Sequence, residues 1–207
     1  MRVLLIIDIC GTLVKENTTH AFIKFISLSW QERAVYSLAM SHLMGLITDC
    51  LHIDLRRRML VRILKGMSQE YLYKAAEEYA KKSLLNQGNE FILSEISKHK
   101  NSTICLASAS LDPIVSAFAK LIKADCFVAS QLAYDSNGLC KGYISDDATG
   151  RKWELITRNC KINVNHHFVK TYTDNSEDID LIENSNIVYF LNKADKFVEI
   201  HSSFTMS

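Results

Sequence analysis

The order of apolar and polar residues predicts one buried strand at the start of the chain, followed by helices. Residues 3–7 form a short, continuous apolar run that ends at Asp8, which indicates a strand buried on both faces, central in its sheet. Apolar residues then recur at helical spacing over 21–47, 55–64 and 72–84, with breaks at Gly66 and at residues 86–89. This early part of the chain therefore predicts an all-helical insert.

From residue 90 the pattern alternates between helix and strand. It predicts helices over 91–98, 114–123 and 152–158 and from Glu177, and strands over 103–107, 126–129, 168–173 and, last, 187–191. Residues 131–144, with Asp135-Ser136-Asn137-Gly138 at their middle, predict a hairpin. Such alternation is typical of a parallel sheet. We therefore predict an α/β protein with a doubly wound, mostly parallel sheet, interrupted early by the helical insert.

Composition places few further limits on the function. The chain has 207 residues, of which 48% are apolar and 23% charged, and a length of this order suits one α/β domain with an inserted subdomain. The net charge of +1 gives no electrostatic support for binding to nucleic acid. Six cysteines show neither a CxxC pair nor the spacing of a metal site, and we interpret them as buried free thiols in a reducing compartment.

No segment predicts export or membrane insertion. The N-terminal apolar run is too short for the core of a signal peptide. The weakly polar stretch 34–47 is shorter than the roughly 20 residues that cross a bilayer, and we interpret it as a buried helix, with contact at a membrane surface as an alternative. We expect a cytoplasmic protein without an integral membrane segment, and the sequence does not indicate its oligomeric state.

Polar residues follow predicted strands or begin a helix at four places. Asp8 and Ser108 each follow a strand, Lys152 begins a helix, and Asp174 with Asp178 follows the strand 168–173. The carboxyl ends of neighbouring parallel strands form the ligand crevice of an open sheet, so we expect these side chains to converge. Each residue alone has an ordinary structural explanation, but the ordered set predicts a functional site.

Four motifs at these positions resemble those of the haloacid dehalogenase superfamily, in the family's order and spacing. They read Asp8-Ile9-Cys10-Gly11-Thr12-Leu13, Ala107-Ser108-Ala109-Ser110, Gly150-Arg151-Lys152 and Tyr172-Thr173-Asp174-Asn175-Ser176-Glu177-Asp178. The insert resembles the helical C1-type cap of the phosphoserine-phosphatase-like branch. The resemblance implies a Rossmann-like catalytic core over residues 1–18 and 87–207 and a helical cap over residues 19–86.

The resemblance also implies Mg²⁺-dependent hydrolysis of a small phosphomonoester. Asp8 would attack the phosphoryl group and form an aspartyl-phosphate, which divides one difficult displacement into two easier steps. The carboxylates of Asp8 and Asp174 and the main-chain carbonyl of Cys10 would hold the Mg²⁺ ion. Asp178 would hold either a metal-bound water or the catalytic lysine. The resemblance therefore implies that Asp178 belongs to the metal site without naming it as a direct ligand.

Three further residues would act on the substrate phosphate. The resemblance implies that Thr12 and Ser108 donate hydrogen bonds to phosphoryl oxygens and that Lys152 neutralises charge on the transferring group. Asn17 stands where phosphoserine phosphatases carry an acidic residue for the substrate's amino group, which makes phosphoserine itself a less favoured substrate.

The cap offers further candidates. Arginines at positions 56, 57, 58 and 62 are candidates for contact with a substrate, although such a run usually forms a solvated helix face. We expect four large residues, Trp30, Tyr36, Met40 and Met44, to pack inside the cap, with an apolar lining for a lipid-like substrate as the alternative.

Cys10 is the main departure from the family's pattern. The family's phosphatases carry an acid/base aspartate two residues after the nucleophile, and such catalysis contributes about 10²- to 10⁴-fold to the rate. A thiol has an ordinary pKa of about 8.5 and is a poor substitute for this aspartate in proton transfer. Cys10 therefore occupies a catalytic position of the family without the family's carboxylate. Four interpretations stay open: a slow phosphatase, an enzyme with another acid, a phosphotransferase, and a phosphate-binding pseudoenzyme. We favour retained phosphoryl chemistry because Asp8, Lys152 and both late aspartates are present.

Overall fold

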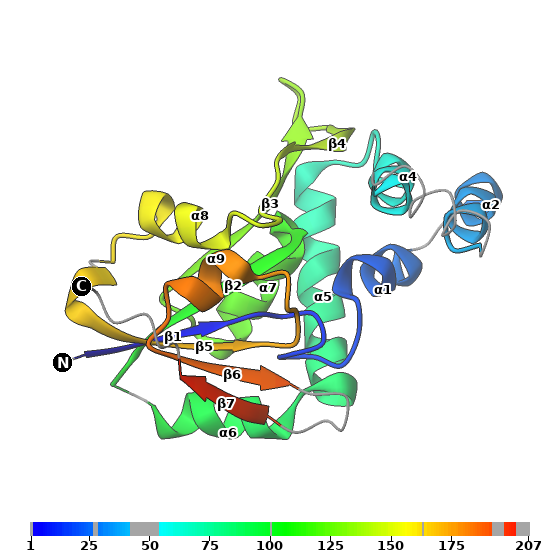
Figure 1. Ribbon diagram of the computed structural model, residues 1–207. Coiled ribbons are helices and arrows are strands. Elements are labelled where there is room, and N and C mark those ends of the chain that lie inside the picture. The colour runs from blue at the N-terminus through cyan, green and yellow to red at the C-terminus, as the bar shows by residue number, and fades with distance from the viewer. Residues whose placement is uncertain are drawn as a thin grey trace.

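The computed structural model describes residues 2–26, 29–41, 54–99, 101–162, 164–191 and 197–201. These ranges contain a seven-stranded sheet of order β4-β3-β2-β1-β5-β6-β7 (Figure 1). Its strands are β1 (Arg2–Ile7), β2 (Thr103–Leu111), β3 (Cys126–Tyr134), β4 (Cys140–Asp146), β5 (His167–Thr173), β6 (Ile187–Leu191) and β7 (Phe197–His201). The strands from β3 to β6 in this order are parallel, and β4 and β7 are antiparallel edge strands. The predicted α/β class and the central position of β1 are confirmed.

Helices cover both faces of the sheet, which explains the continuous apolar run of β1. Leu5 and Ile7 pack into the core beneath the helices α5 (Gln69–Gln87), α6 (Glu90–Lys98) and α7 (Asp112–Ile122). Leu4 and Ile6 point to the opposite face, into a second core beneath α8 (Lys152–Asn159) and α9 (Ile179–Glu183). Successive side chains of a strand alternate between faces, so a strand buried on both faces needs apolar residues throughout.

The segment predicted as a helical insert contains α1 (Thr18–Phe25), α2 (Trp30–Ala39), α4 (Leu55–Ile63) and α5. The apolar stretch 21–47 is interrupted, because Ile26 ends α1 with extended backbone and Ser29 begins α2 in a capping box with Glu32. Residues 42–47 lie outside the described ranges. In the described part of the stretch 34–47, Ala39 is the one buried residue of α2, so the prediction of a buried helix is wrong there.

The expected packing of the large residues of α2 is also corrected. Trp30 is 78% exposed and Met40 is 40% exposed, whereas Tyr36 packs partly against the core. Met44 lies outside the described residues. Trp30 is the first residue of α2, a helix whose one buried residue is Ala39, so the large side chains at its two ends lie exposed.

The helices of the insert pack in two ways. The α2 and α4 helices contact each other and α4 contacts β4, whereas α5 runs along α7 in the layer that covers the sheet (Figure 1). The division into a core of residues 1–18 and 87–207 and a cap of residues 19–86 stays a prediction.

The strand predictions hold with two differences. The hairpin is confirmed by the antiparallel pairing of β3 with β4, and β2 and β3 extend beyond the predicted ranges. The prediction that residues 187–191 form the last strand is wrong, because β7 follows and pairs antiparallel with β6. Phe197 at the start of β7 stacks on Phe91 of α6, with ring centroids 4.9 Å apart, so a long-range contact stabilises this short edge strand.

Within the described ranges, no helix combines the length and the apolar character needed to cross a membrane.

Candidate active site

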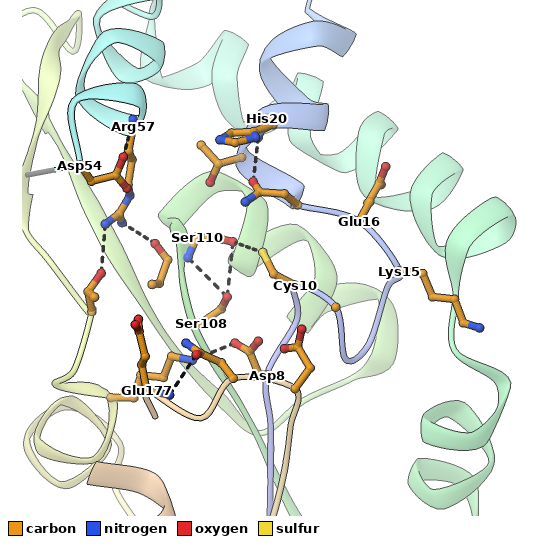
Figure 2. A pocket seen from close by; sticks show the side chains of 18 residues that line it. Asp8, Cys10, Lys15, Glu16, His20, Asp54, Arg57, Ser108, Ser110 and Glu177 are labelled. Carbon is orange, nitrogen blue, oxygen red and sulfur yellow. Dashed lines mark hydrogen bonds and ion pairs between the residues drawn. The ribbon is translucent and has the colours of Figure 1, made fainter. Parts of the chain in front are cut away.

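The strands β1 and β5 end at the same level beside β2, and a pocket of about 630 Å³ opens there. Ile7 pairs with Leu106 of β2 and with Tyr172 of β5, so residues that follow these positions lie at one edge of the sheet. The sequence-predicted residues that line the pocket are Asp8, Cys10, Ser108, Lys152 and Asp174 (Figure 2). The predicted convergence is therefore confirmed for Asp8, Ser108, Lys152 and Asp174, and Cys10 lies in the same pocket.

A buried ion cluster of Asp8, Lys152 and Asp178 forms the base of the pocket. Lys152 Nζ donates to Asp8 Oδ1 at 3.0 Å and to Asp178 Oδ2 at 2.7 Å, and the hydroxyl of Thr173 donates to the same Asp178 oxygen at 2.8 Å. The three charged side chains are at most 5% exposed. Buried charges of this kind persist where they are paired and hydrogen-bonded.

The pKa values in this cluster follow from burial and from its charges. Burial raises the pKa of Asp8 to about 6, although the Lys152 ammonium acts in the opposite direction. Burial alone would lower the pKa of Lys152, but the carboxylates of Asp8 and Asp178 raise it. Near pH 7 the cluster therefore holds an ionised Asp8 beside a permanently charged lysine.

Asp174 faces the same pocket from the loop after β5. It accepts a hydrogen bond from the Thr12 hydroxyl at 3.3 Å, and burial raises its pKa. Gly11 has a φ angle of +70°, and a Cβ atom at this position would overlap the Asp174 carboxylate. Glycine is therefore required here both by the turn after β1 and by the close approach of Asp174.

The donor atoms of this site fit a hard divalent cation. Asp8 and Asp174 present carboxylates to one pocket, and Asp178 adds a third carboxylate beside the Lys152 ammonium. Oxygen ligands with excess negative charge are what Mg²⁺ prefers. Asp178 is bonded to Lys152 and Thr173, which matches the lysine-holding alternative of its two implied roles, and its part in metal binding stays a prediction.

Replacing Gly11 with Ala should weaken Mg²⁺ binding because the added methyl group displaces the Asp174 carboxylate. The matched control is Gly138→Ala, since Gly138 has a φ angle of +74° and open space around its Cβ position. We expect both variants to lose about 1–2 kcal/mol of unfolding free energy in chemical denaturation, and only Gly11→Ala to lose about 10- to 100-fold in Mg²⁺ affinity by calorimetry. Equal affinities in the two variants would contradict the role given to Asp174.

Cys10 is held in a network of hydroxyl groups. Its Sγ lies 3.1 Å from the Ser110 hydroxyl (Figure 2). It also lies 3.0 Å from the Thr18 hydroxyl, and the two hydroxyls are 2.6 Å apart. The Thr18 N–H also donates to the sulfur at 3.4 Å. Burial and the nearby carboxylate of Asp8 raise the pKa of Cys10, so the thiol stays protonated near pH 7. A protonated thiol is a weak proton donor and offers no base, so this position lacks the carboxylate that would serve in acid–base catalysis.

The same network reaches Ser108. The Ser108 hydroxyl donates to Ser110 Oγ at 3.3 Å, and the Ser110 N–H donates to Ser108 Oγ at 3.3 Å. Ser110 lies within the second sequence motif but was given no role from the sequence, and Thr18 carried no signal beyond its place at a helix start. Ser110 lies in β2 and Thr18 is the first residue of α1, so the packing of these elements beside the turn after β1 brings both to Cys10.

Arg57 reaches the pocket from α4 on the side opposite Asp8 (Figure 2). Its guanidinium donates to both carboxylate oxygens of Asp147 at 2.9 and 3.0 Å, to Thr149 Oγ1 at 3.0 Å, to Ser130 Oγ at 2.7 Å and to the Ala109 carbonyl. The arginine run on α4 thus supplies one pocket residue whose donors are engaged by protein acceptors. Arg57 ties α4 to the loop before α8.

Asn17 and Glu16 also line the pocket, but both have local structural partners. Asn17 caps α1 by accepting a hydrogen bond from the His20 N–H at 3.1 Å. Glu16 accepts hydrogen bonds from the hydroxyls of Tyr79 and Ser83 at 2.8 and 2.5 Å. The position at which the resemblance implies contact with a substrate amino group is therefore used to begin α1, and Glu16 attaches the start of α1 to α5.

The chain belongs to the haloacid dehalogenase-like hydrolase family. The model of that family matches residues 5–183, which include all four sequence motifs. The resemblance inferred from the motifs is thereby confirmed, and no curated protein matches the sequence significantly.

Solved structures share the fold at low sequence identity. A protein of unknown function from Bordetella pertussis Tohama I has a TM-score of 0.75 at 14% identity, over 92% of this chain and 90% of that one. A phosphoserine phosphohydrolase-like protein from Francisella tularensis has a TM-score of 0.62 at 17% identity, with coverages of 92% and 87%. A phosphoserine phosphatase with an analogue of its phospho-aspartyl intermediate has a TM-score of 0.57 at 18% identity, with coverages of 91% and 86%.

Proposed function

We propose that this protein is a Mg²⁺-dependent hydrolase of a small phosphomonoester, with Asp8 as the nucleophile and an aspartyl-phosphate as the intermediate. The observation that carries the proposal is the buried ion cluster of Asp8, Lys152 and Asp178 at the base of a pocket that Asp174 also faces. Membership in a hydrolase family supports the reaction class.

Each residue of the site has a part in the first step. Asp8 would attack the phosphorus atom through a carboxylate oxygen, and the alcohol of the substrate would leave. Lys152 would neutralise charge on the phosphoryl oxygens from a position that Asp178 holds. Ser108 would donate to a phosphoryl oxygen. For Thr12 the same role requires its hydroxyl to exchange the Asp174 acceptor for the phosphate.

We propose that the carboxylates of Asp8 and Asp174 and the main-chain carbonyl of Cys10 would hold Mg²⁺. When bound there, the ion would offset the repulsion between an anionic nucleophile and an anionic phosphate. Asp8 is buried and Asp174 faces the same pocket, so a bound cation would also offset the repulsion between these two carboxylates.

Cys10 makes hydrolysis of the intermediate the slow step of this proposal. Its protonated thiol is bonded to Thr18 and Ser110, and it does not offer a base that activates water. A long-lived aspartyl-phosphate favours the second candidate function, which is transfer of the phosphoryl group to an acceptor alcohol. A phosphate-binding protein without turnover is the third.

The pocket supports a small phosphorylated metabolite as substrate. Its volume of about 630 Å³ and its lining by basic and acidic side chains suit a polar ligand. We propose that the cap, of which α1 and α4 contribute pocket residues, closes over the bound substrate. Asn17 is neutral and its side chain caps α1, which makes phosphoserine itself a less favoured substrate. Free thiols at the five cysteines within the described ranges support a cytoplasmic location.

A phosphatase panel of small phosphomonoesters tests this proposal. We expect phosphate release that depends on Mg²⁺ and disappears with a chelator. Product that forms faster when an acceptor alcohol is supplied would favour transfer over hydrolysis. Mg²⁺-dependent ligand binding with neither product nor phosphorylated Asp8, detected by mass spectrometry, would overturn the enzymatic proposal.

A further inference from the structure

Three cysteines meet on the face of the sheet that α8 covers. Cys105 lies in β2, Cys126 pairs with it in β3, and Cys160 ends α8. Their sulfur atoms all lie within 4.8 Å of one another, and all three are free thiols. The cluster lies outside the active-site pocket and has no part in the proposed phosphoryl chemistry. The spacing of these cysteines in the sequence gave no metal signal, because the sheet and α8 bring them together.

We propose that Cys105, Cys126 and Cys160 form a binding site for a soft metal ion, with Zn²⁺ as the ion that fits best. Thiolate sulfur is a preferred ligand of Zn²⁺, and three protein ligands leave a fourth position for water. A Zn–S distance of about 2.3 Å in a tetrahedral site places sulfurs about 3.8 Å apart. From at most 4.8 Å, the three sulfurs therefore need to approach one another by about 1 Å at most.

The site has an entry path. Cys105 is fully buried, but Cys126 and Cys160 both line a surface hollow of about 380 Å³. Lys120 and Lys123 line the same hollow. Three thiolates with one divalent ion carry a net charge of −1, which the Lys123 ammonium can offset across the hollow, whereas Lys120 pairs with Glu77 and Asp125 adds a carboxylate to the lining. A water molecule in the hollow can complete the coordination of the ion.

The position of Cys160 links this site to the stability of α8. The C-terminal end of a helix carries a partial negative charge, which favours a cation beside Cys160. A bound ion would join the end of α8 to β2 and β3, and Lys152 is the first residue of the same helix. We therefore expect Zn²⁺ to raise the thermal unfolding midpoint of the protein, since a ligand that binds only the folded state stabilises it.

Titration of the reduced protein with Co²⁺ tests the site, with Mg²⁺ in excess to occupy oxygen ligands. Co²⁺ takes the place of Zn²⁺, and its bond to thiolate gives a charge-transfer band in the near ultraviolet. We expect this band to saturate at one equivalent and to disappear when Zn²⁺ is added. Cys126→Ser and Cys160→Ser should each lose about 100-fold or more in Zn²⁺ affinity, measured against a chelating dye.

The controls are Cys140→Ser and Cys10→Ser, which remove cysteines outside the cluster and should leave the band unchanged. Cys126 is only partly buried, so its substitution by Ser should leave the protein folded, as circular dichroism will show. Absence of the band in the wild-type protein, or its persistence in both Cys126→Ser and Cys160→Ser, would overturn the proposal. These readouts do not depend on phosphatase activity.

Discussion

Asp8→Asn should abolish phosphate release, with a loss of about 10⁴-fold or more in turnover. The amide is too weak a nucleophile to form the covalent intermediate, whereas its oxygen can still accept the hydrogen bond that Lys152 donates to Asp8 Oδ1 at 3.0 Å. The variant should therefore fold and still bind substrate. The measurement is initial phosphate release at saturating Mg²⁺, together with mass spectrometry of the protein after rapid acid quenching.

The control for this substitution is Asp135→Asn in the β3–β4 turn. There the Asp135 carboxylate accepts hydrogen bonds from the N–H groups of Asn137 and Leu139. The amide oxygen of an asparagine can accept the same two bonds. Activity should be unchanged in this control. If Asp8→Asn keeps more than about one hundredth of the wild-type turnover, Asp8 is not the nucleophile.

Stability against pH gives a second readout for Asp8. Burial raises the pKa of Asp8 from 3.8 to about 6 in the folded protein. Ionisation of Asp8 therefore opposes folding, and its contribution to the free energy of unfolding should fall as pH rises from 3.8 to about 6 in protein without metal. Asp8→Asn should lack this fall.

Cys10→Asp should raise phosphate release by about 10²- to 10⁴-fold. The structure already holds donors for the introduced carboxylate, because the Thr18 N–H and the hydroxyls of Thr18 and Ser110 surround the Cys10 sulfur at 3.0 to 3.4 Å. A carboxylic acid there can protonate the leaving alcohol and then, as a carboxylate, activate water. The gain should appear most clearly in the decay of the aspartyl-phosphate, followed by single-turnover quench experiments.

The matched control is Cys10→Asn, which is close in size to the aspartate variant and can use the same donors but cannot transfer a proton. It should show no gain over the wild-type protein. An equal rate in Cys10→Asp and Cys10→Asn would mean that another group already supplies the acid and base. In that case the slow step of the proposed cycle does not arise from Cys10.

Predictions from the sequence succeeded where the signal is local in the chain. The apolar run before Asp8 requires burial on both faces, and that places β1 at the centre of the sheet. Regular alternation of strands and helices predicts a mostly parallel sheet. The carboxyl ends of its strands lie at one edge, where Asp8, Ser108 and Lys152 meet. The turn residues at 135–138 predicted the β3–β4 hairpin for the same local reason.

Local patterns did not predict the features that depend on packing between distant segments of the chain. The apolar character of residues 34–39 predicted burial, but burial depends on which helix face meets a neighbour, and α2 exposes Trp30 and Leu38. The short strand β7 depends on pairing with β6 and on the stacking of Phe197. Neither contact leaves a periodic signal in the sequence.

The sequence by itself determined the family, the central strand and the charged residues of the site, because each depends on residue type at a fixed place in a local motif. Only the tertiary structure decided how those residues are held. It places Cys10 between two hydroxyls, engages the donors of Arg57 with protein acceptors and gathers Cys105, Cys126 and Cys160 into one cluster. These contacts join residues far apart in the chain, and the registers of the strands and the packing of the helices bring them together.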